Sequence, residues 1–370
     1  MASSIVGPAL LWTLLWASVG LLALQLVLVV WARVARTRRQ GRDARTLAPL
    51  RPLLLELASG DEDASEDLSR ALAGAPVSTR KVVDEAILQL LGKIRGDSST
   101  ALVDVLHRHN RERSAIEDLA SRSSVTRAHA VWTLGVMQEA VSVPMVVPML
   151  QDRSSDVVLT AARALGMIGD PVAATAILTS VAPVGSRAGL PAWIAVEAVT
   201  SLGTDTAPQV QAALDHPSPD VRWAAAMVIA QIPLLAAAGA LRETVTRETD
   251  PRLVSVMVLA LGVVGGPRDT ALLGSLLEEA QDAQIRRAAI GALAEVGGSG
   301  ALVWLEPMLS SSDVRVAESA ATTLVSLGPV GHAAVAAMAL SEESSASTRL
   351  CRYAVRQHGL GRSRAVRRAG

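Results

Sequence analysis

Thiols and most kinds of aromatic side chain are almost absent from this sequence. Its 370 residues include one cysteine (Cys351), one tyrosine, no phenylalanine and seven tryptophans. A single thiol cannot form an internal disulfide or a zinc site with several cysteine ligands, and it suits a reducing compartment. The apolar half of the chain is therefore mainly aliphatic, and its core must be built from Ala, Val, Leu and Ile.

Linear signatures of catalysis are also missing. The sequence contains no GxxxxGK[ST], HExxH, GxSxG, GxGxxG or CxxC motif, and these motifs mark the common nucleotide, metal and nucleophile sites. His107 and His109 are two residues apart, so on a helix they point about 200° away from each other and cannot share a metal ion. We expect both to be solvent-exposed. The sequence therefore predicts no catalytic residue, no metal ligand and no cofactor.

Neither charge dominates the whole chain, because 35 basic residues balance 35 acidic ones. The charge is segregated, however: residues 33–45 carry +5, residues 349–370 carry +7, and residues 46–348 must then carry −12. An acidic body offers no continuous basic track for phosphates, so we predict no nucleic-acid partner. The basic C-terminal tail is expected to touch the membrane or an acidic partner.

A long apolar run lies near the start of the chain. Residues 5–32 are 28 residues without a formal charge, whereas about 20 apolar residues are enough for a helix to cross the hydrocarbon layer. Trp12, Trp16 and Trp31 lie towards the ends of this run, where indoles favour the headgroup layer. The run is too long for a cleaved signal peptide, and no basic residue precedes it. The sequence therefore predicts an uncleaved transmembrane anchor over residues 1–32.

Basic residues follow this run directly. Residues 33–51 form a juxtamembrane segment that begins with an arginine-rich stretch, while the N-terminal tail has no basic side chain. By the positive-inside rule, the N-terminus lies outside and the rest of the chain lies in the cytoplasm. Anionic lipid headgroups are expected partners of these arginines, at about 1 kcal/mol per residue near the surface. The predicted membrane-interface residues are Trp12, Trp16, Trp31, Arg33, Arg36, Arg38 and Arg39.

A repeated pattern occupies most of the remaining chain. Seven small and aliphatic segments end at Gln138, Gly169, Gly203, Pro233, Gly265, Gly297 and Gly328, with spacings of 31, 34, 30, 32, 32 and 31 residues. One and four positions earlier every segment has an aliphatic residue, and eight positions earlier six have Ala and one has Met. This pattern predicts an amphipathic helix with a small-residue stacking face. A second helix follows each segment, and the next unit begins at a cap such as Asp156, Ser218, Asp250, Asp282 or Ser312.

Two of these segments carry a resemblance to a known family. DVRWAAAMVIAQIP and QIRRAAIGALAEVG have Val or Ile before Arg and an Ala-rich helix after it, and they resemble the short bacterial HEAT repeats often called phycobilisome-lyase-like. The resemblance covers about residues 122–343. It implies an all-α solenoid of about seven HEAT-type helix pairs with terminal caps. The marking arginines are Arg127, Arg222, Arg252, Arg286 and Arg315.

The flanking segments are expected to cap this solenoid. Residues 52–121 form a helical N-terminal cap region, with helical spacing at 80–95 and 100–110 and an acidic, mobile linker at 60–69. Residues 344–370 supply a C-terminal capping helix and the basic tail.

The activities of known HEAT-repeat enzymes do not transfer to these residues. Deoxyhypusine hydroxylase holds iron through His-Glu pairs, but none of the six histidines here is followed by Glu. Nothing in the sequence marks a bilin site of the lyase type, and a membrane anchor is unusual for such a lyase.

Second helices line the concave face of HEAT solenoids, so their polar residues are the predicted partner surface. Trp304 is the best aromatic candidate on that surface, because Trp132, Trp193 and Trp223 fall in first helices, where we expect them to be buried. The predicted partner-binding residues are Arg242, Glu243, Arg247, Glu278, Glu279, Trp304 and Glu306.

These observations predict a non-catalytic scaffold that crosses the inner membrane of a bacterium once and holds a partner protein at its cytoplasmic face. The ratio of 33 Arg to 2 Lys suggests a GC-rich bacterium. Two alternatives stay open. One is an enzyme or enzyme subunit of the HEAT-like lyase type, with active groups assembled across repeats. The other is an accessory subunit of an envelope polysaccharide or glycosyltransferase system.

Overall fold

The computed structural model describes residues 8–59, 62–93, 98–183, 189–340 and 347–356. Helices make up most of these residues, and a lone parallel bridge joins Val181 and Leu190. The prediction of an all-α chain is therefore confirmed for the described residues. The chain divides into two compact units, Met1–Ser114 and Ala115–Gly370.

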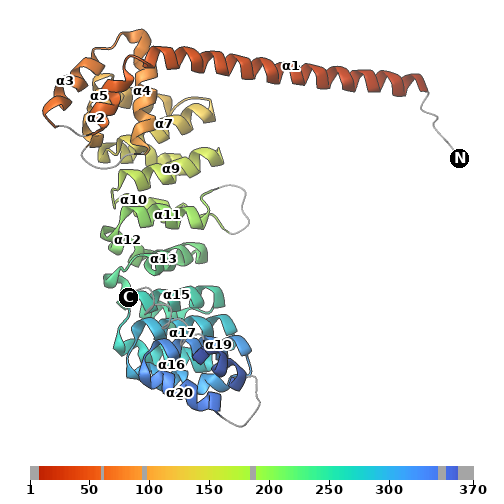
Figure 1. The fold of residues 1–370 in the computed structure, drawn as a ribbon, viewed down its shortest axis with the longest axis vertical. Helices are drawn as coiled ribbons and strands as arrows, with labels where there is room; N and C mark the ends of the chain where they lie inside the picture. The colour runs from red at the N-terminus through yellow and green to blue at the C-terminus, as the bar shows by residue number, and fades with distance from the viewer. Residues whose placement is uncertain (1–7, 60–61, 94–97, 184–188, 341–346, 357–370) are drawn as a thin grey trace. The chain divides into compact units, whose positions relative to one another are not determined.

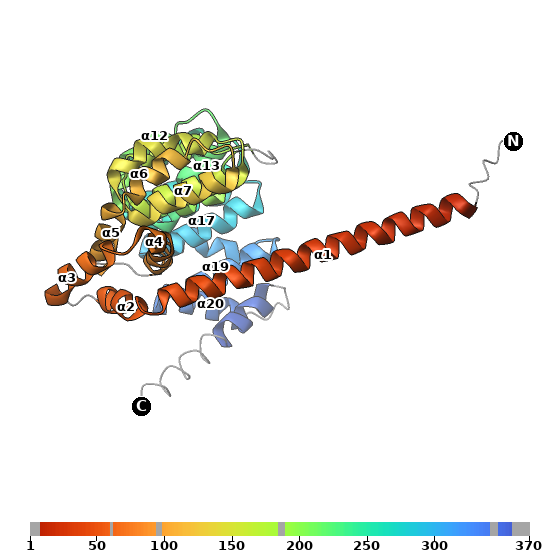
Figure 2. The same cartoon turned by 90° about the horizontal axis from the view of Figure 1, so that it is seen from above.

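The first unit begins with a single long helix. Figure 2 shows α1 (Pro8–Leu47) as one unbroken helix of 40 residues, which continues through the predicted anchor boundary at residue 32. Its side chains are described without interruption from 16 to 28, and every one of these is exposed. Within the described residues, no helix has both the length and the apolar character that a membrane crossing requires.

Four shorter helices lie wholly within the described part of the first unit: α2 (Arg51–Ser59), α3 (Glu62–Ala73), α4 (Val77–Leu91) and α5 (Ser98–Arg108). The two helices predicted over 80–95 and 100–110 are thus confirmed as α4 and α5. The acidic linker is wrong for residues 62–69, which belong to α3. This segment is helical because Leu72 is fully buried and the Ser69 hydroxyl donates a hydrogen bond of 2.9 Å to Asp104 on α5.

His109 differs from its prediction. Its side chain is only 1 % exposed, and its Nδ1 lies 2.5 Å from Oδ1 of Asp84 on α4. Its Nε2 lies 3.3 Å from the carbonyl oxygen of Ala73. The histidine joins segments that are 25 and 36 residues away along the chain, and local spacing contains no information about such a contact.

The second unit is an array of helix pairs. After α6 (Arg111–Asp118), the described residues contain seven first helices, stacked in chain order in Figure 1: α7 (Ser124–Met137), α9 (Ser155–Ile168), α11 (Ala192–Leu202), α13 (Pro219–Gln231), α15 (Pro251–Val264), α17 (Ala283–Val296) and α19 (Val314–Ser326). Their second helices are α8 (Val143–Val146) with the 3-10 turn Val147–Gln151, α10 (Ala173–Thr179), α12 (Ala207–Ala213), α14 (Ala238–Arg247), α16 (Thr270–Glu279), α18 (Ser299–Leu305) with the 3-10 turn Pro307–Ser310, and α20 (Pro329–Leu340). Residues 347–356 are also helical, while 357–370 lie outside the described residues.

The repeat pattern forms the core as predicted. All seven aliphatic residues four positions before the predicted helix ends are fully buried. The six alanines and Met257, which lie eight positions before the same helix ends, are fully buried too. The residues one position before the ends are mixed, since Met137, Leu202 and Val264 are buried and the other four are half-buried. Small residues bring the first helices close together: a Cβ added to Gly135 would lie 2.6 Å from Cβ of Ala164 on the next first helix.

The helix ends follow the predicted residues within two positions, with some changes of detail. Gly169 adopts φ 80° after α9, as a left-handed C-cap does, whereas Gly265 has φ −77° and is extended. Two predicted N-caps are wrong: α9 is capped at Ser154 rather than Asp156, and α19 at Asp313 rather than Ser312. At α19 the deciding contact is a hydrogen bond of 2.9 Å from the Arg315 backbone N–H to the Asp313 carboxylate.

Candidate partner-binding pocket

A largely apolar pocket of about 440 Å³ opens at the N-terminal ends of three consecutive first helices, α11, α13 and α15. The stretch of chain that leads into α11 forms its remaining wall. Alanine, proline and tryptophan predominate in its lining: Ala182, Pro183, Gly189, Pro191, Ala192, Trp193, Pro219, Asp220, Trp223, Arg252 and Leu253. Pockets of this size and composition hold small molecules or a side-chain anchor of another protein.

The wall before α11 is held by a short backbone pairing. The N–H of Ala182 donates to the carbonyl of Leu190 over 2.9 Å, and the N–H of Leu190 donates to the carbonyl of Ser180 over 3.3 Å. Gly189 has φ 102°, and a Cβ there would lie 2.6 Å from Cβ of Ala182. Glycine is therefore required at this position for both conformation and space. The pairing fixes Pro191 as the N-cap of α11 and so places Trp193 at the pocket rim.

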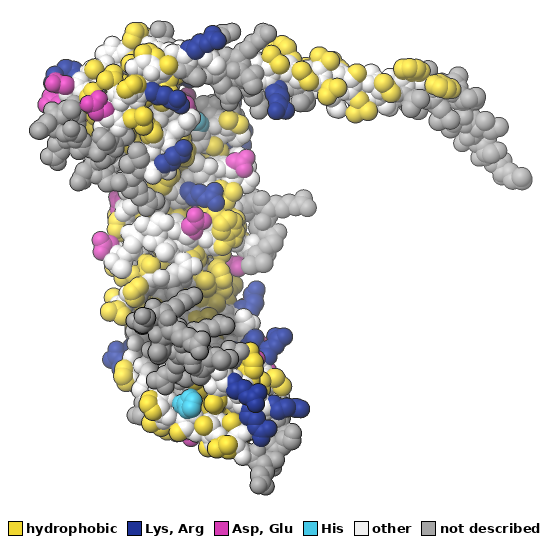
Figure 3. Space-filling model, viewed as in Figure 1, with side chains coloured by type: hydrophobic (Ala, Val, Ile, Leu, Met, Phe, Trp, Pro, Cys, Tyr) yellow, Lys and Arg dark blue, Asp and Glu magenta, His cyan; other side chains and the backbone are white. Residues whose placement is uncertain are grey.

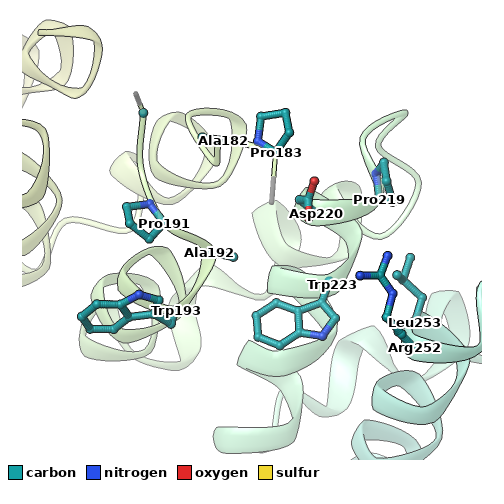
Figure 4. A pocket seen from close by; sticks show the side chains of 11 residues that line it. Ala182, Pro183, Pro191, Ala192, Trp193, Pro219, Asp220, Trp223, Arg252 and Leu253 are labelled. Atoms are coloured by element: carbon teal, nitrogen blue, oxygen red, sulfur yellow. The ribbon is translucent and has the colours of Figure 1, made fainter. Parts of the chain in front are cut away.

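Two indoles dominate the pocket. Figure 4 shows Trp193 on α11, Trp223 on α13 and Arg252 on α15 following one another across it. Trp193 is 60 % exposed, so the prediction that it is buried is wrong, while Trp223 is partly buried against the core. Within the described part of the chain, neither indole N–H has a hydrogen-bond partner. Tryptophan beside an apolar pocket is enriched among the residues that contribute most to protein interfaces.

Asp220 and Arg252 are the charged residues in the described lining of the pocket. Arg252 forms an ion pair of 2.9 Å with Asp250, and the Asp250 carboxylate also accepts the Arg252 backbone N–H over 2.9 Å. Hydrogen bonds from the Arg252 side chain and backbone lower the pKa of Asp250, and the same ion pair, with the nearby charge of Asp220, raises the pKa of Arg252. Among the lining residues that the structure describes, none carries a hydroxyl, thiol or imidazole group.

The predicted partner surface on the second helices is partly engaged within the chain. Arg242 forms an ion pair with Asp269, whose side chain is 2 % exposed. Arg247 is exposed and pairs with Asp215 of the preceding repeat over 2.9 Å. The four acidic residues of the set are all exposed: Glu243, Glu278, Glu279 and Glu306. Their role in binding stays a prediction.

Trp304 packs partly into the repeat array. It is half-buried against the core, and a Cβ added to Gly274 on α16 would lie 2.1 Å from its Cδ2 atom. The indole of α18 therefore lies directly on the bare backbone of α16. Partner binding through Trp304 is untested, but its position already has a packing explanation.

The predicted membrane-interface residues belong to α1. Trp12, Trp16, Trp31 and Arg33 are exposed. The side chains of Arg36, Arg38 and Arg39 lie outside the described residues. Lipid contact by any of these residues stays a prediction.

Comparison with known families decides the identity of the array. The family model described as HEAT repeats matches residues 114–185, 206–294 and 270–356, which is more than half of the chain. The chain belongs to the HEAT-repeat family. As a HEAT-repeat protein it has the helix-pair solenoid that its period predicts. Comparison with curated protein sequences gives no match.

Solved structures are similar to this HEAT-repeat protein in fold. Human deoxyhypusine hydroxylase in complex with glycerol is 19 % identical with a TM-score of 0.28, over 80 % of this chain and 96 % of that one. The CpcE and CpcF complex of phycocyanin lyase from Nostoc sp. PCC7120 is 21 % identical with a TM-score of 0.27, over 78 % and 92 %. Kap95p, in a structure of its binding to RanGDP, is 12 % identical with a TM-score of 0.50, over 83 % and 48 %. This chain therefore spans about half the length of Kap95p, and the likeness concerns the fold alone.

The sequence contains a weak indication of the pocket. Trp193 and Trp223 lie 30 residues apart, one repeat period, and the longest spacing between helix ends, 34 residues, falls where the wall before α11 is inserted. A longer unit with proline and glycine beside a tryptophan indicates a local departure from the repeat. That signal marks the place but does not tell whether the indole turns inward or outward.

Proposed function

We propose that this HEAT-repeat protein is a membrane-anchored scaffold that holds a partner protein and catalyses no reaction of its own. The observation that carries the proposal is the pocket at the ends of α11, α13 and α15, with Trp193 exposed at its rim. Tryptophan is enriched among the residues that contribute most to protein–protein binding, especially beside a preformed apolar pocket. The Kap95p likeness adds that this fold serves protein binding elsewhere.

The anchor is proposed from the sequence and from the exposure of α1. Residues 5–32 carry no formal charge, and Leu22, Leu26 and Val27 are each more than 60 % exposed on α1. Yellow apolar side chains extend along this helix in Figure 3. A surface of this kind needs a lipid or protein cover. The arginines from residue 33 onward favour an N-out topology, with the HEAT repeats in the cytoplasm of a bacterium.

The proposed anchor would favour partner binding at the pocket. A single span confines the scaffold to the membrane plane, and this confinement raises the effective concentration of whatever the solenoid binds. Membrane systems that assemble envelope polysaccharides are one setting in which such a scaffold is useful.

Site-specific photo-crosslinking tests the proposal on the full chain in its native membrane. A photo-reactive phenylalanine analogue replaces Trp193 in one variant, Glu243 in a second and Glu278 in a third. We expect one stoichiometric partner to crosslink from position 193, and we expect Trp193→Ala to lose the same partner in a pull-down without crosslinking.

The matched positions distinguish the two candidate surfaces. Crosslinks from 243 and 278 alone would move the binding surface to the second helices and overturn the assignment to the pocket. Absence of any partner from all three positions at native expression would overturn the scaffold function itself.

A further inference from the structure

The marking arginines of the early repeats and those of the later repeats differ in their hydrogen-bond partners. In the early repeats, their guanidinium groups form hydrogen bonds to carboxylates and carbonyls of the same chain. Arg127 bonds to Asp152 and to the carbonyls of Ser121 and Arg122. Arg222 bonds to Glu248, which precedes the next first helix, over 2.9 Å and to the carbonyls of His216 and Pro217 over 3.0 Å each. Each pair joins one repeat to the start of the next.

Among the described residues, the marking arginines of the later repeats lack such ion pairs between one repeat and the next. Within the part of the chain that the structure describes, Arg286, Arg287 and Arg315 form no ion pair with an acid. The Nε of Arg286 is buried and has no hydrogen-bond partner, while Nε of Arg287 donates only to the carbonyl of Ala283 over 3.3 Å. Arg252 pairs with Asp250, yet 68 % of its side chain is exposed. A buried guanidinium N–H without an acceptor is costly and requires an explanation.

The two acids that cap α17 and α19 are already engaged with the backbone. The carboxylate of Asp282 accepts the N–H of Gln284 over 2.6 Å, and that of Asp313 accepts the N–H of Arg315 over 2.9 Å. Both are helix caps, so turning them towards the arginine side chains would leave helix N–H groups unpaired. These two capping carboxylates therefore do not supply acceptors for the arginine side chains, which stay available to a ligand.

We propose that Arg252, Arg286, Arg287 and Arg315, here called the arginine edge, bind an extended acidic segment of the partner protein. This inference rests on the proposed function, because the apolar anchor of the same segment fills the pocket between Trp193 and Trp223. Arg252 lines that pocket and begins the arginine edge, so the two surfaces are continuous. Charge complementarity selects acidic over basic or neutral segments.

The repeat geometry specifies the spacing of the acids. All four arginines lie among the first five residues of α15, α17 or α19, at the same end of consecutive helices. Packed helices lie about 8–10 Å apart, and an extended peptide in the polyproline II conformation advances about 3.1 Å per residue with every third side chain on the same face. One repeat therefore corresponds to about three peptide residues. The expected ligand has an apolar anchor followed by an acid at every third position over roughly ten residues.

The surface view agrees with this assignment. In Figure 3, dark blue Lys and Arg side chains gather at this end of the later repeats, next to a yellow apolar region over the middle repeats. Guanidinium groups suit carboxylates, because they donate two parallel hydrogen bonds in a plane.

A peptide-binding measurement on the full chain in zwitterionic nanodiscs tests the inference. The probe is a fluorescent peptide of about 12 residues, with Leu and Pro at one end and Glu at every third position after them. We expect binding that weakens with salt and that falls by about tenfold or more in the double variant Arg286→Glu/Arg287→Glu. The single variant Arg315→Glu, which changes an exposed and unpaired side chain, is expected to weaken binding in the same direction.

The controls separate charge recognition from loss of fold. Arg163→Glu, at an exposed position within α9, is expected to bind the peptide as the unchanged chain does. A peptide with Lys in place of Glu is expected not to bind. Equal binding of the two peptides, no binding of the acidic one, or no effect of the arginine variants would overturn the inference.

Two further outcomes have distinct meanings. If Trp193→Ala loses the native partner but Arg286→Glu/Arg287→Glu and Arg315→Glu retain it, the scaffold function stands and the arginine edge is wrong. Vesicles that contain phosphatidylglycerol test the other anionic ligand. If these vesicles bind to the chain held in zwitterionic nanodiscs and the arginine variants abolish that binding, the arginine edge binds lipid. The proposal of an acidic protein segment is then overturned.

Discussion

Arg127 on α7 donates hydrogen bonds of 2.7 Å from Nε and Nη2 to the two carboxylate oxygens of Asp152, 25 residues later in the chain. Both side chains are less than a tenth exposed. This two-pronged contact joins the first repeat to the start of the second, because Asp152 also accepts the N–H of Ser154, the N-cap of α9. The same residue type that marks the repeat in the sequence therefore connects consecutive repeats in the structure.

These inter-repeat carboxylates predict a loss of stability in acid. The hydrogen bond from Arg127 lowers the pKa of Asp152 against the effect of burial. Burial raises the pKa of Glu248, but hydrogen bonds from the N–H of Asp250 and from Arg222 outweigh it and bring the pKa below its ordinary value. A pKa that is lower in the folded than in the unfolded chain stabilises the fold above the unfolded pKa, and that stabilisation is lost as the pH falls through the folded pKa.

We therefore expect the thermal midpoint to be steady near neutral pH and to fall below about pH 4.5. Asp152→Asn is expected to lower the midpoint at neutral pH and to reduce the further drop in acid. Scanning calorimetry between about pH 3 and pH 7 measures both. A drop in acid of the same size in Asp152→Asn and the unchanged chain would assign the transition to other carboxylates.

The Arg242–Asp269 pair predicts a large cost for removing one partner. Asp269 is almost fully buried and also accepts the N–H of Gly266 over 2.8 Å. Asp269→Ala leaves a guanidinium and a backbone N–H without their acceptor, so we expect a loss of about 3 kcal/mol in the free energy of unfolding. Asp215→Ala breaks the exposed pair with Arg247 and is expected to cost less than about 1 kcal/mol. Urea denaturation of the two variants compares them directly, and equal costs would contradict the role of burial.

The contact between Gly274 and Trp304 predicts that a larger residue at 274 clashes with the indole, whereas the same substitution at another helical glycine does not. A methyl group at 274 would overlap the indole, whereas Gly291 on α17 has nothing within 4 Å of an added Cβ. We expect Gly274→Ala to lose about 1–3 kcal/mol through displacement of the indole. Gly291→Ala is expected to gain up to about 1 kcal/mol, since alanine favours the helix. Tryptophan fluorescence during unfolding follows both variants, and a neutral Gly274→Ala would show that Trp304 moves freely.

The proposed anchor predicts a defined topology. We expect the full chain to stay in the membrane pellet during alkaline carbonate extraction, because a single span is not released by high pH. Deletion of residues 1–32 is expected to move the protein to the supernatant. Release of the full chain by carbonate would contradict a spanning helix and indicate a peripheral contact.

Cysteine labelling resolves the orientation of the chain. The native Cys351 is buried, and burial raises the pKa of its thiol, so it reacts slowly with maleimide. Ser3→Cys is expected to react with an impermeant maleimide on intact spheroplasts, and Ser326→Cys, at an exposed position of α19, only after permeabilisation. The reverse pattern would invert the topology.

Much of the fold was accessible to sequence analysis because repetition amplifies a weak local signal. A single aliphatic residue such as Leu134 says little, but the same choice at Leu165, Leu261 and Leu293 marks one buried stripe, and all four are fully buried. Helix ends were predictable for the same reason. The acidic segment from Glu62 was not, because its helix depends on the burial of Leu72 in a unit that has no repeat to compare.

The candidate site was less accessible. Trp193 and Trp223 occupy first helices, where burial is the common outcome, yet the indole of Trp193 is exposed beside the segment paired through Ala182 and Leu190. Trp304, predicted to lie on the partner surface, is half-buried because Gly274 on the neighbouring helix accommodates its ring, and its role in binding stays a prediction.

The amino-acid sequence by itself determined the helix-pair period, the buried stripe and the segregation of charge, since each of these depends on residue type at regular local spacing. Tertiary structure decided which arginines are satisfied. Arg127 meets Asp152, whereas Arg286 has a buried N–H that meets no acceptor. The physical reason is distance along the chain: such partners lie about one repeat away, and whether two side chains meet across a repeat depends on packing that local periodicity does not encode.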